Sequence, residues 1–362
     1  MVDTLVASLG YGATFLAMVV VITVVHEFGH FLAARHFGVR VEVFAVGFGK
    51  ELLGWTDTRG TRWKLCLLPL GGYVRMFGEG DRMDEARPRS MTDDARSYAT
   101  LPAGRRAAIL LAGPLANLAF AVAALAALVL IVGRVVPSPE IGVVDPAGAA
   151  AAAGLHAGDR IIAVDGRPID SFAAVDAAVA GAAGRDIVLT VTRDGMGRSV
   201  VVRPATVARD GALRGDIGAV AAGRERVAVG PLAAGAFAFE QTAAFTAHNI
   251  AFIRQVATGA RGLEDLAGPL RIAQISGRKV AELGLAALVV ITAMLSVNVG
   301  LFNLLPIPLL DGGHLLFLAV ERLRGRRVSH RVQRLCVVGG LTAVLAFSLA
   351  TTLNDVLHLA SD

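Results

Sequence analysis

The sequence has few cysteines and few charged residues. Its two cysteines, Cys66 and Cys336, lie far apart and predict neither a disulfide framework nor a cysteine metal site. Charged residues make up 18% of the chain and hydrophobic residues 54%, with a mean hydropathy of +0.60. This balance is too apolar for an ordinary soluble protein and indicates a polytopic membrane protein with a modest extramembrane part.

Basic residues are missing from both ends of the chain. The first ten residues contain no Lys or Arg, so a cleavable signal peptide is not evident and the first apolar run is expected to be a retained anchor. The tail after Leu353 also lacks them. Arginines and lysines gather instead in 35–106 and 319–331, which the positive-inside rule makes cytoplasmic. Both termini and residues 134–284 are then expected outside.

Four apolar stretches are long enough to span a bilayer, which takes about 20 helical residues. They run from about Leu5 to Ala34, Ala107 to Val132, Leu285 to Leu310 and Val332 to Leu353. The predicted divisions are 1–34, 35–106, 107–133, 134–210, 211–284, 285–318, 319–331 and 332–362, with transmembrane helices in the first, third, sixth and last.

The segments between the spans carry weaker signals. Residues 60–76 predict a β-hairpin, either dipping toward the membrane or lying on the surface, and 78–97 predict a mobile linker. Residues 140–204 predict a compact β-rich module with tight turns at Asp165-Gly166 and Asp194-Gly195. A helix over 231–256 could lie on the membrane surface or pack on that module.

The segment His26-Glu27-Phe28-Gly29-His30 lies inside the first apolar run. Histidines four residues apart share a helix face, so both imidazoles can reach one metal ion. Glu27 can then take a proton from a metal-bound water. Such a pattern also arises by chance, but ionisable groups within an uncharged apolar stretch are costly and functional by default.

A third ligand is predicted at Asp311, the only acid between Leu285 and Val320. A carboxylate in an apolar region needs a partner, and zinc held by two neutral histidines provides one. Three protein ligands leave a fourth position for water, as in catalytic zinc sites. Gly312 and Gly313 are expected to allow close backbone approach to the metal.

Three polar residues nearby have open interpretations. His314 either supports the metal site or marks a helix end at the water interface. Asn298 and Asn303 either hold helices together or, for Asn303, orient the backbone of a substrate.

Five segments together resemble one known family. They are His26–His30, Gly47–Gly49, Pro69–Met76, Ala112–Asn117 and Asn303–His314. In this order, and over nearly the whole chain, they are similar to a bacterial site-2 protease of the regulator-of-sigma-E-protease type, an intramembrane zinc metalloprotease. Gly268-Pro269 also resembles the family's segment before the third core helix.

The resemblance implies a polytopic α-helical membrane protein of the bacterial inner membrane, with one extracytoplasmic PDZ-like α+β domain. It implies His26, His30 and Asp311 as zinc ligands and Glu27 as the catalytic acid/base. It also implies a membrane-dipping hairpin whose edge, at Gly71, Gly72, Tyr73 and Val74, holds an extended substrate. The sequence has room for a single PDZ-like module, whereas some members have two.

The expected partners are the lipid bilayer and single-span membrane proteins, such as an anti-sigma factor, with signal-peptide remnants as further substrates; no nucleic acid is expected. A non-catalytic scaffold that recruits partners through the PDZ-like module would need neither the ligand set nor Glu27. A metal transporter would favour ionisable ligands in several helices, and the second and fourth apolar stretches supply almost none.

Overall fold

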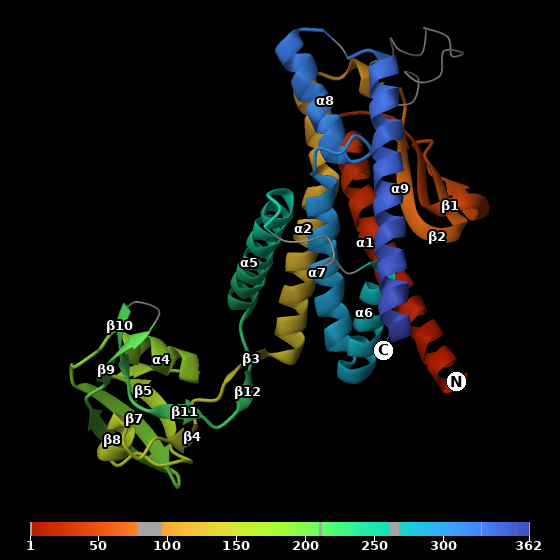
Figure 1. Cartoon of the computed structure of the whole chain (residues 1–362). Coiled ribbons are helices and arrows are strands. Elements are labelled where there is room, and N and C mark those ends of the chain that lie inside the picture. Colours follow the sequence, from red (N-terminus) through yellow and green to blue (C-terminus); the bar gives the residue numbers. More distant parts are fainter. Residues whose placement is uncertain (1, 79–95, 210–211, 261–267, 327, 362) are drawn as a thin grey trace. The chain divides into compact units, whose positions relative to one another are not determined.

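The chain folds into two compact units, which are described separately (Figure 1). Unit 1 comprises Met1–Ala127 and Gly235–Asp362, and unit 2 comprises Leu128–Ala234. The computed structural model describes residues 2–78, 96–209, 212–260, 268–326 and 328–361. Most of the predicted linker over 78–97 therefore lies outside the described residues.

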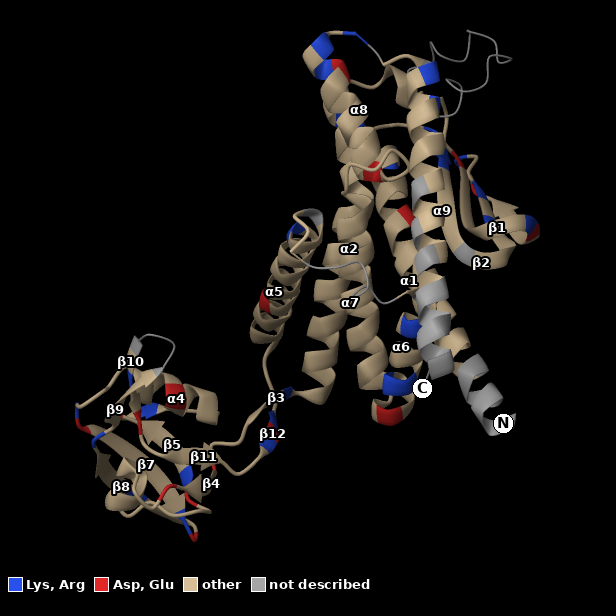
Figure 2. Ribbon diagram, in the orientation of Figure 1, with Lys and Arg blue, Asp and Glu red and all other residues tan. Residues whose placement is uncertain are grey.

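Three long apolar helices form the body of unit 1. They are α1 (Val2–His36), α2 (Ala103–Val132) and α7 (Leu285–Asn303). Each contains a stretch long and apolar enough to cross a membrane. Figure 2 shows that their middle parts carry few charged residues, whereas Lys and Arg gather where α8 ends and α9 begins. These helices match three of the four predicted spans.

The fourth predicted span lies within the helix α9 (His330–Ser361). Within the described part of the chain, α9 is not among the helices that combine the length and apolar composition of a span. The predicted basic loop over 319–331 is too long, because α8 (Asp311–Arg324) continues through its first six residues. A membrane crossing by α9 stays a prediction.

The predicted third span, 285–318, is not one helix. α7 ends at Asn303, α8 begins at Asp311, and an irregular stretch containing Pro306 and Pro308 lies between them. Proline has no N–H to continue a helical ladder, and its ring disfavours helical backbone in the residue before it. Asp311 consequently stands at the start of a new helix.

Gly312 and Gly313 form the first turn of α8. A side chain on Gly312 would meet the carbonyls of Leu304 and Leu305, and one on Gly313 would meet the carbonyl of Ile307. The two glycines therefore let the irregular stretch pack closely on α8. Their predicted close approach to a metal stays a prediction; in the structure these Cα atoms face the preceding backbone.

A curved β-hairpin follows α1. It consists of β1 (Val41–Thr56) and β2 (Arg62–Met76), which pair antiparallel. The chain reverses near Gly71 (φ 117°) and returns, as predicted for 60–76, but the two halves of β2 pair with β1, which lies between them, and not with each other. Residues 43–46 pair with 62–65 on one side and with 72–75 on the other. Residues 72–75 thus form an edge with no further strand beside it among the described residues.

The turn of this hairpin is fastened to the end of α1. Asp57 accepts hydrogen bonds from the Arg35 guanidinium (2.6 Å), the Thr61 N–H (3.0 Å) and the Trp63 indole (3.2 Å). Burial alone would raise the pKa of Asp57, but these donors hold it well below its usual range. The Thr61 hydroxyl donates in turn to the Val41 carbonyl, which ties the start of β1 to the same turn.

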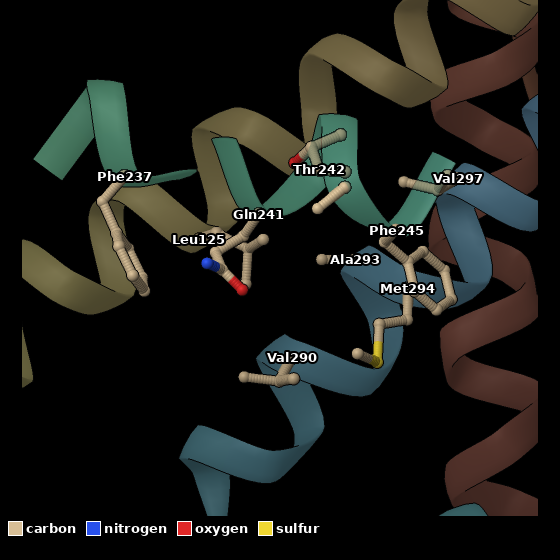
Figure 3. A pocket seen from close by; sticks show the side chains of 11 residues that line it. Leu125, Phe237, Gln241, Thr242, Phe245, Val290, Ala293, Met294 and Val297 are labelled. Atoms are coloured by element: carbon tan, nitrogen blue, oxygen red, sulfur yellow. The ribbon is translucent and has the colours of Figure 1, made fainter. Parts of the chain in front are cut away.

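Two further helices cover the long ones. α5 (Pro231–Ala257) contains the predicted helix over 231–256, and its Phe245 packs on Ala121 of α2 and on Ala293 and Val297 of α7. Figure 3 shows the apolar cavity of about 350 Å³ that these three helices line. α6 (Pro269–Leu283) contacts α1, α7 and α9.

Unit 2 contains a four-stranded antiparallel sheet in the order β6-β5-β7-β8. Its strands are β5 (Arg160–Val164), β6 (Arg167–Pro168), β7 (Ile187–Arg193) and β8 (Met196–Val202), with the helices α3 (Ala149–Ala152) and α4 (Phe172–Ala180). Ile161, Leu189 and Val191 of the sheet and Val175 of α4 are fully buried in one core. Asp165 and Asp194 have positive φ in the turns before Gly166 and Gly195, which confirms both predicted turns.

The predicted C-terminal boundary of this module, residue 210, is too early. The remaining strands are β3 (Arg134–Pro137), β4 (Ile141–Val144), β9 (Ala205–Arg209), β10 (Ala212–Asp216), β11 (Ala219–Ala221) and β12 (Arg224–Val227). β11 pairs with β4 and β12 pairs with β3. Such pairs between distant segments have no local sequence signal, so the boundary was missed.

A buried ion pair joins the start of α2 to α8. Arg106 Nη2 lies 3.6 Å from Glu321 Oε2, and both side chains are 9% exposed. Replacing Arg106 by Met would leave the Glu321 carboxylate buried without a counter-charge. We expect the free energy of unfolding to fall by about 3 kcal/mol, measured by denaturant unfolding in detergent micelles.

The control is the exposed pair formed by Lys279 and Glu282, whose side chains are 54% and 49% exposed. Lys279→Met should change stability by less than about 1 kcal/mol. Equal stability of the Arg106→Met protein and the wild type would show that the buried pair does not stabilise the fold.

Candidate metal centre and active site

α1 carries the HEFGH segment. Its helical geometry places His26 and His30 on one face, with ring centroids 4.8 Å apart, and both side chains are buried. Glu27, the next residue along the helix, is half-buried. The predicted pairing of the two imidazoles is therefore present in the folded chain.

Asp311 completes the group from the other end of the sequence. Its Oδ2 lies 3.1 Å from His26 Nε2 and 3.4 Å from His30 Nε2, and the two Nε2 atoms are 3.2 Å apart. As the first residue of α8, the carboxylate also lies at the positive end of that helix dipole. Residues nearly three hundred positions apart in sequence thus present three ligand atoms to one point.

The spacing of these atoms fits zinc. Ligands bound tetrahedrally at about 2.0–2.1 Å stand about 3.3 Å from one another. The three observed distances match one face of such a tetrahedron. The donor set of two imidazoles and one carboxylate is also that of catalytic zinc sites, which leave a position open for water. His26, His30 and Asp311 are therefore the candidate zinc ligands.

Groups behind the ligands orient them. His30 Nδ1 lies 2.8 Å from the Ile109 carbonyl, so Nδ1 carries the proton and donates it there. This hydrogen bond leaves Nε2 unprotonated and aimed at the metal position. On the other imidazole, His26 Nδ1 lies 3.3 Å from the side-chain amide of Asn117, which is fully buried in α2.

Gly113 of α2 faces the ligand atoms directly. A Cβ atom at this position would contact His30 Nε2 and lie 2.9 Å from His26 Nε2. Gly29 of α1 similarly packs on the Ala112 carbonyl, with no room for a side chain. The absence of side chains at these two positions lets α2 approach α1 and leaves space for a metal ion.

The hairpin edge lies beside Glu27. The Val74 N–H donates a hydrogen bond to the Glu27 carboxylate, and a Cβ on Gly72 would lie 3.5 Å from Glu27 Cγ. Two of the four residues predicted on this edge are thus next to the predicted acid/base. The other two pack with Phe48: its ring lies beside Gly71 and stacks on Tyr73, with ring centroids 6.0 Å apart.

The remaining polar residues singled out in the sequence make no contact with the candidate ligands that the structure records. Asn303 Nδ2 donates to the Val299 carbonyl within α7. His314, in the first turn of α8, is exposed, and its ring lies 6.3 Å from that of Phe317. Asn298 Oδ1 is buried, and no hydrogen-bond partner for it is found among the described residues.

Sequence reasoning did not assign roles to Ile109, Gly113 and Asn117. Two of them belong to the segment Ala112–Asn117, which was noted only as a family motif. Its glycine and asparagine in an apolar helix were a usable signal, since small residues allow close helix contact and polar ones need a partner. Ile109 acts through its backbone carbonyl, so its side chain gives no signal.

A glutamate beside three candidate metal ligands, two of them on a helix long enough to cross a bilayer, defines a membrane metallohydrolase. The chain belongs to peptidase family M50, whose family model matches residues 14–347. It is therefore a membrane zinc metalloprotease of the site-2 protease type.

Relatives in several bacteria cover almost the whole chain. A protein of Rhizobium meliloti, provisionally named a zinc metalloprotease, is 39% identical over 357 residues, covering 95% of both chains. A similarly named protein of Brucella suis is 37% identical, covering 94% of this chain and 93% of its own. The regulator of sigma-E protease RseP of Escherichia coli is 31% identical over 443 residues, covering 93% of this chain and 96% of its own.

The close approach of α2 gives a test of the metal position. A methyl group at residue 113 would occupy the space between the two imidazole Nε2 atoms. We expect Gly113→Ala protein, purified in detergent, to lose most of its bound zinc, measured by mass spectrometry of the metal. Gly104→Ala in the same helix, where a Cβ meets nothing within 4 Å, should keep the wild-type zinc content. Wild-type zinc content in Gly113→Ala protein would place the metal elsewhere.

Proposed function

We propose that this protease hydrolyses peptide bonds in or near the transmembrane segments of single-span membrane proteins, with His26, His30 and Asp311 as its zinc ligands and Glu27 as its acid/base. The observation that carries the proposal is the meeting of three ligand atoms within 3.4 Å of one another, beside Glu27, where the apolar helix α1 meets the start of α8. Ionisable groups at that depth are expensive unless they bind a cation and react.

The chemistry divides between the metal and the chain. Zinc, when bound, supplies Lewis-acid activation of water and of the scissile carbonyl. The Glu27 carboxylate takes the proton of the attacking water and later returns it to the leaving amine. The hydrogen bond from the Val74 N–H holds this carboxylate in a fixed direction beside the ligands.

The edge of the hairpin supports a way to hold the substrate. The carbonyls of a helical substrate are already hydrogen-bonded, so the segment must unwind before it can be cut. An extended segment can add as a strand along residues 72–75, whose far side is already paired with 43–46. Strand addition there would lay the substrate backbone next to Glu27. Asn303, eight residues before Asp311, is proposed to help orient it.

The surface of the hairpin supports a position in the membrane. Large apolar side chains project from β1 and β2 with exposed fractions between 42% and 67%: Phe48, Leu52, Leu53, Trp55, Leu65, Leu67 and Leu68. Such a patch in water would be a liability, whereas lipid would cover it. We propose that the hairpin dips into the cytoplasmic side of the inner membrane, that α9 is a fourth span, and that both termini are extracytoplasmic.

Unit 2 is proposed to be a single PDZ-like domain outside the membrane. Its small core of antiparallel strands, two helices and paired entry and exit strands supports that assignment. The alignment with the Escherichia coli protease is 443 residues long, more than the 362 residues of this chain, so that relative contains inserted sequence. One module here, against a longer relative, fits the expectation of a single PDZ-like domain.

The substrates are proposed from the name of that relative. It is called a regulator of sigma-E protease. An anti-sigma factor with one transmembrane segment, already shortened outside the membrane, is therefore the proposed substrate class, and signal-peptide remnants are proposed as further substrates.

If Glu27 is the acid/base, a variant that lacks its carboxylate should still bind zinc but should not cleave substrate. Glu27→Gln keeps the size of the side chain and removes its basicity, so cleavage should fall by at least about a thousandfold. The test uses a tagged single-span substrate and purified protein in detergent, with zinc content measured in parallel. A chelator should abolish wild-type cleavage. Sustained proteolysis by the Glu27→Gln protein would refute the role of Glu27.

The strand-addition idea predicts different effects of two substitutions at one position. Val74→Pro removes the N–H of this edge residue, whereas Val74→Ala retains it. In a Glu27→Gln background, where binding is separated from catalysis, substrate crosslinking should fall about tenfold for Val74→Pro and stay unchanged for Val74→Ala. Equal crosslinking by the two proteins would argue against capture at this edge.

A further inference from the structure

The two candidate histidine ligands differ in what lies behind them. His30 Nδ1 faces a backbone carbonyl, which can only accept a hydrogen bond. His26 Nδ1 faces the side-chain amide of Asn117, at 3.3 Å, and an amide offers both a donor and an acceptor. The protonation of His26 Nδ1 therefore depends on which end of that amide is turned toward it.

The two orientations of the amide are not equivalent. With Nδ2 toward the ring, Nδ1 has to accept, so the proton of a neutral imidazole sits on Nε2, the atom that faces Asp311 and His30. In that orientation Asn117 Oδ1 is buried, with no partner among the residues that the structure describes. With Oδ1 toward the ring, Nδ1–H donates to Oδ1, Nε2 carries no proton, and Nδ2 takes the place that Oδ1 left. The nitrogen and oxygen ends of an asparagine amide are distinguished only by this kind of accounting.

We propose that Asn117 is the positioning residue of His26: its Oδ1 accepts the Nδ1–H and so leaves Nε2 unprotonated toward the metal. This inference rests on the proposed ligand set. It gives the two imidazoles the same arrangement, each held from behind by an oxygen acceptor of α2, Ile109 for His30 and Asn117 for His26. Partners of this kind set the tautomer and the ring direction of metal-binding histidines.

Helix α7 braces Asn117 in this position. The hydroxyl of Ser296, fully buried, donates to the Asn117 backbone carbonyl at 3.0 Å. A Cβ on Gly300 would lie 3.3 Å from Asn117 Cβ and 3.0 Å from the Pro114 carbonyl, so α7 is in close contact with this turn of α2. With α7 packed on one side and His26 on the other, the main rearrangement open to the Asn117 amide is the rotation that exchanges Nδ2 and Oδ1.

The test compares zinc affinity, measured by competition with a fluorescent zinc chelator on the full chain in detergent. Asn117→Leu keeps the branching of the side chain at Cγ and removes the acceptor, and its affinity should fall about 10–100-fold. Asn117→Asp keeps an acceptor at the same place and should stay within about threefold of the wild type, a rescue that a purely structural role would not give.

Asn298→Leu is the matched control, because Asn298 is another asparagine in an apolar helix with a buried Oδ1. It should leave zinc affinity unchanged. Wild-type affinity in folded Asn117→Leu protein, or an equal loss in the Leu and Asp variants, would overturn the proposal. If Asn117→Leu does not fold, Asn117→Ala is measured in its place with the same expectation.

His26→Ala separates this inference from the function on which it rests. Loss of zinc binding in that variant supports the ligand set whatever Asn117 does. Retention of wild-type affinity by His26→Ala would refute the ligand set itself, and with it the role of Asn117.

Discussion

The fold depends on keeping two imidazoles and a carboxylate together inside apolar helices. Each of these groups is costly to bury, and the cost is offset only if a cation and well-placed hydrogen bonds satisfy all of them at once. That requirement restrains the register of α1, the start of α8 and the face of α2, because the ligand atoms stand 3.1–3.4 Å apart. Elements that carry no ligand, such as α7, pack around the segments that do.

Close helix contact is what makes the arrangement possible. In lipid there is little hydrophobic drive between helices, so association depends on packing and on a few polar contacts. Gly29 and Gly113 let α1 and α2 meet at the ligands, and Gly300 lets α7 meet α2 one layer behind. The hydrogen bond from Ser296 to Asn117 joins the same two helices. The metal centre and the helix packing are therefore one feature, not two.

The hairpin gives the centre a side on which a substrate can be held. Its turn is fixed to the end of α1 through Asp57 and Arg35, and its edge strand meets Glu27 through Val74. The same element thus orients the proposed acid/base and offers a strand edge, which links substrate capture to catalysis.

The sequence alone determined the chemistry of this protein. The spacing of His26 and His30, the adjacent Glu27 and the isolated Asp311 predict a metal site because helical periodicity and the cost of buried charge are local rules. Apolar run length likewise predicted α1 and α2 to within a few residues and the start of α7, and the Asp-Gly dipeptides predicted two turns of unit 2. These features need no knowledge of distant contacts.

Only the tertiary structure decided what depends on which segments meet. The pairing of β1 with both halves of β2 and the strands β11 and β12 that close unit 2 arise from long-range contacts that leave no local pattern. The roles of Gly113, the Ile109 carbonyl and Asn117 likewise became visible only when α2 was placed against α1. A glycine, a carbonyl and an amide carry no specific signal in sequence, because their function lies in what they are next to.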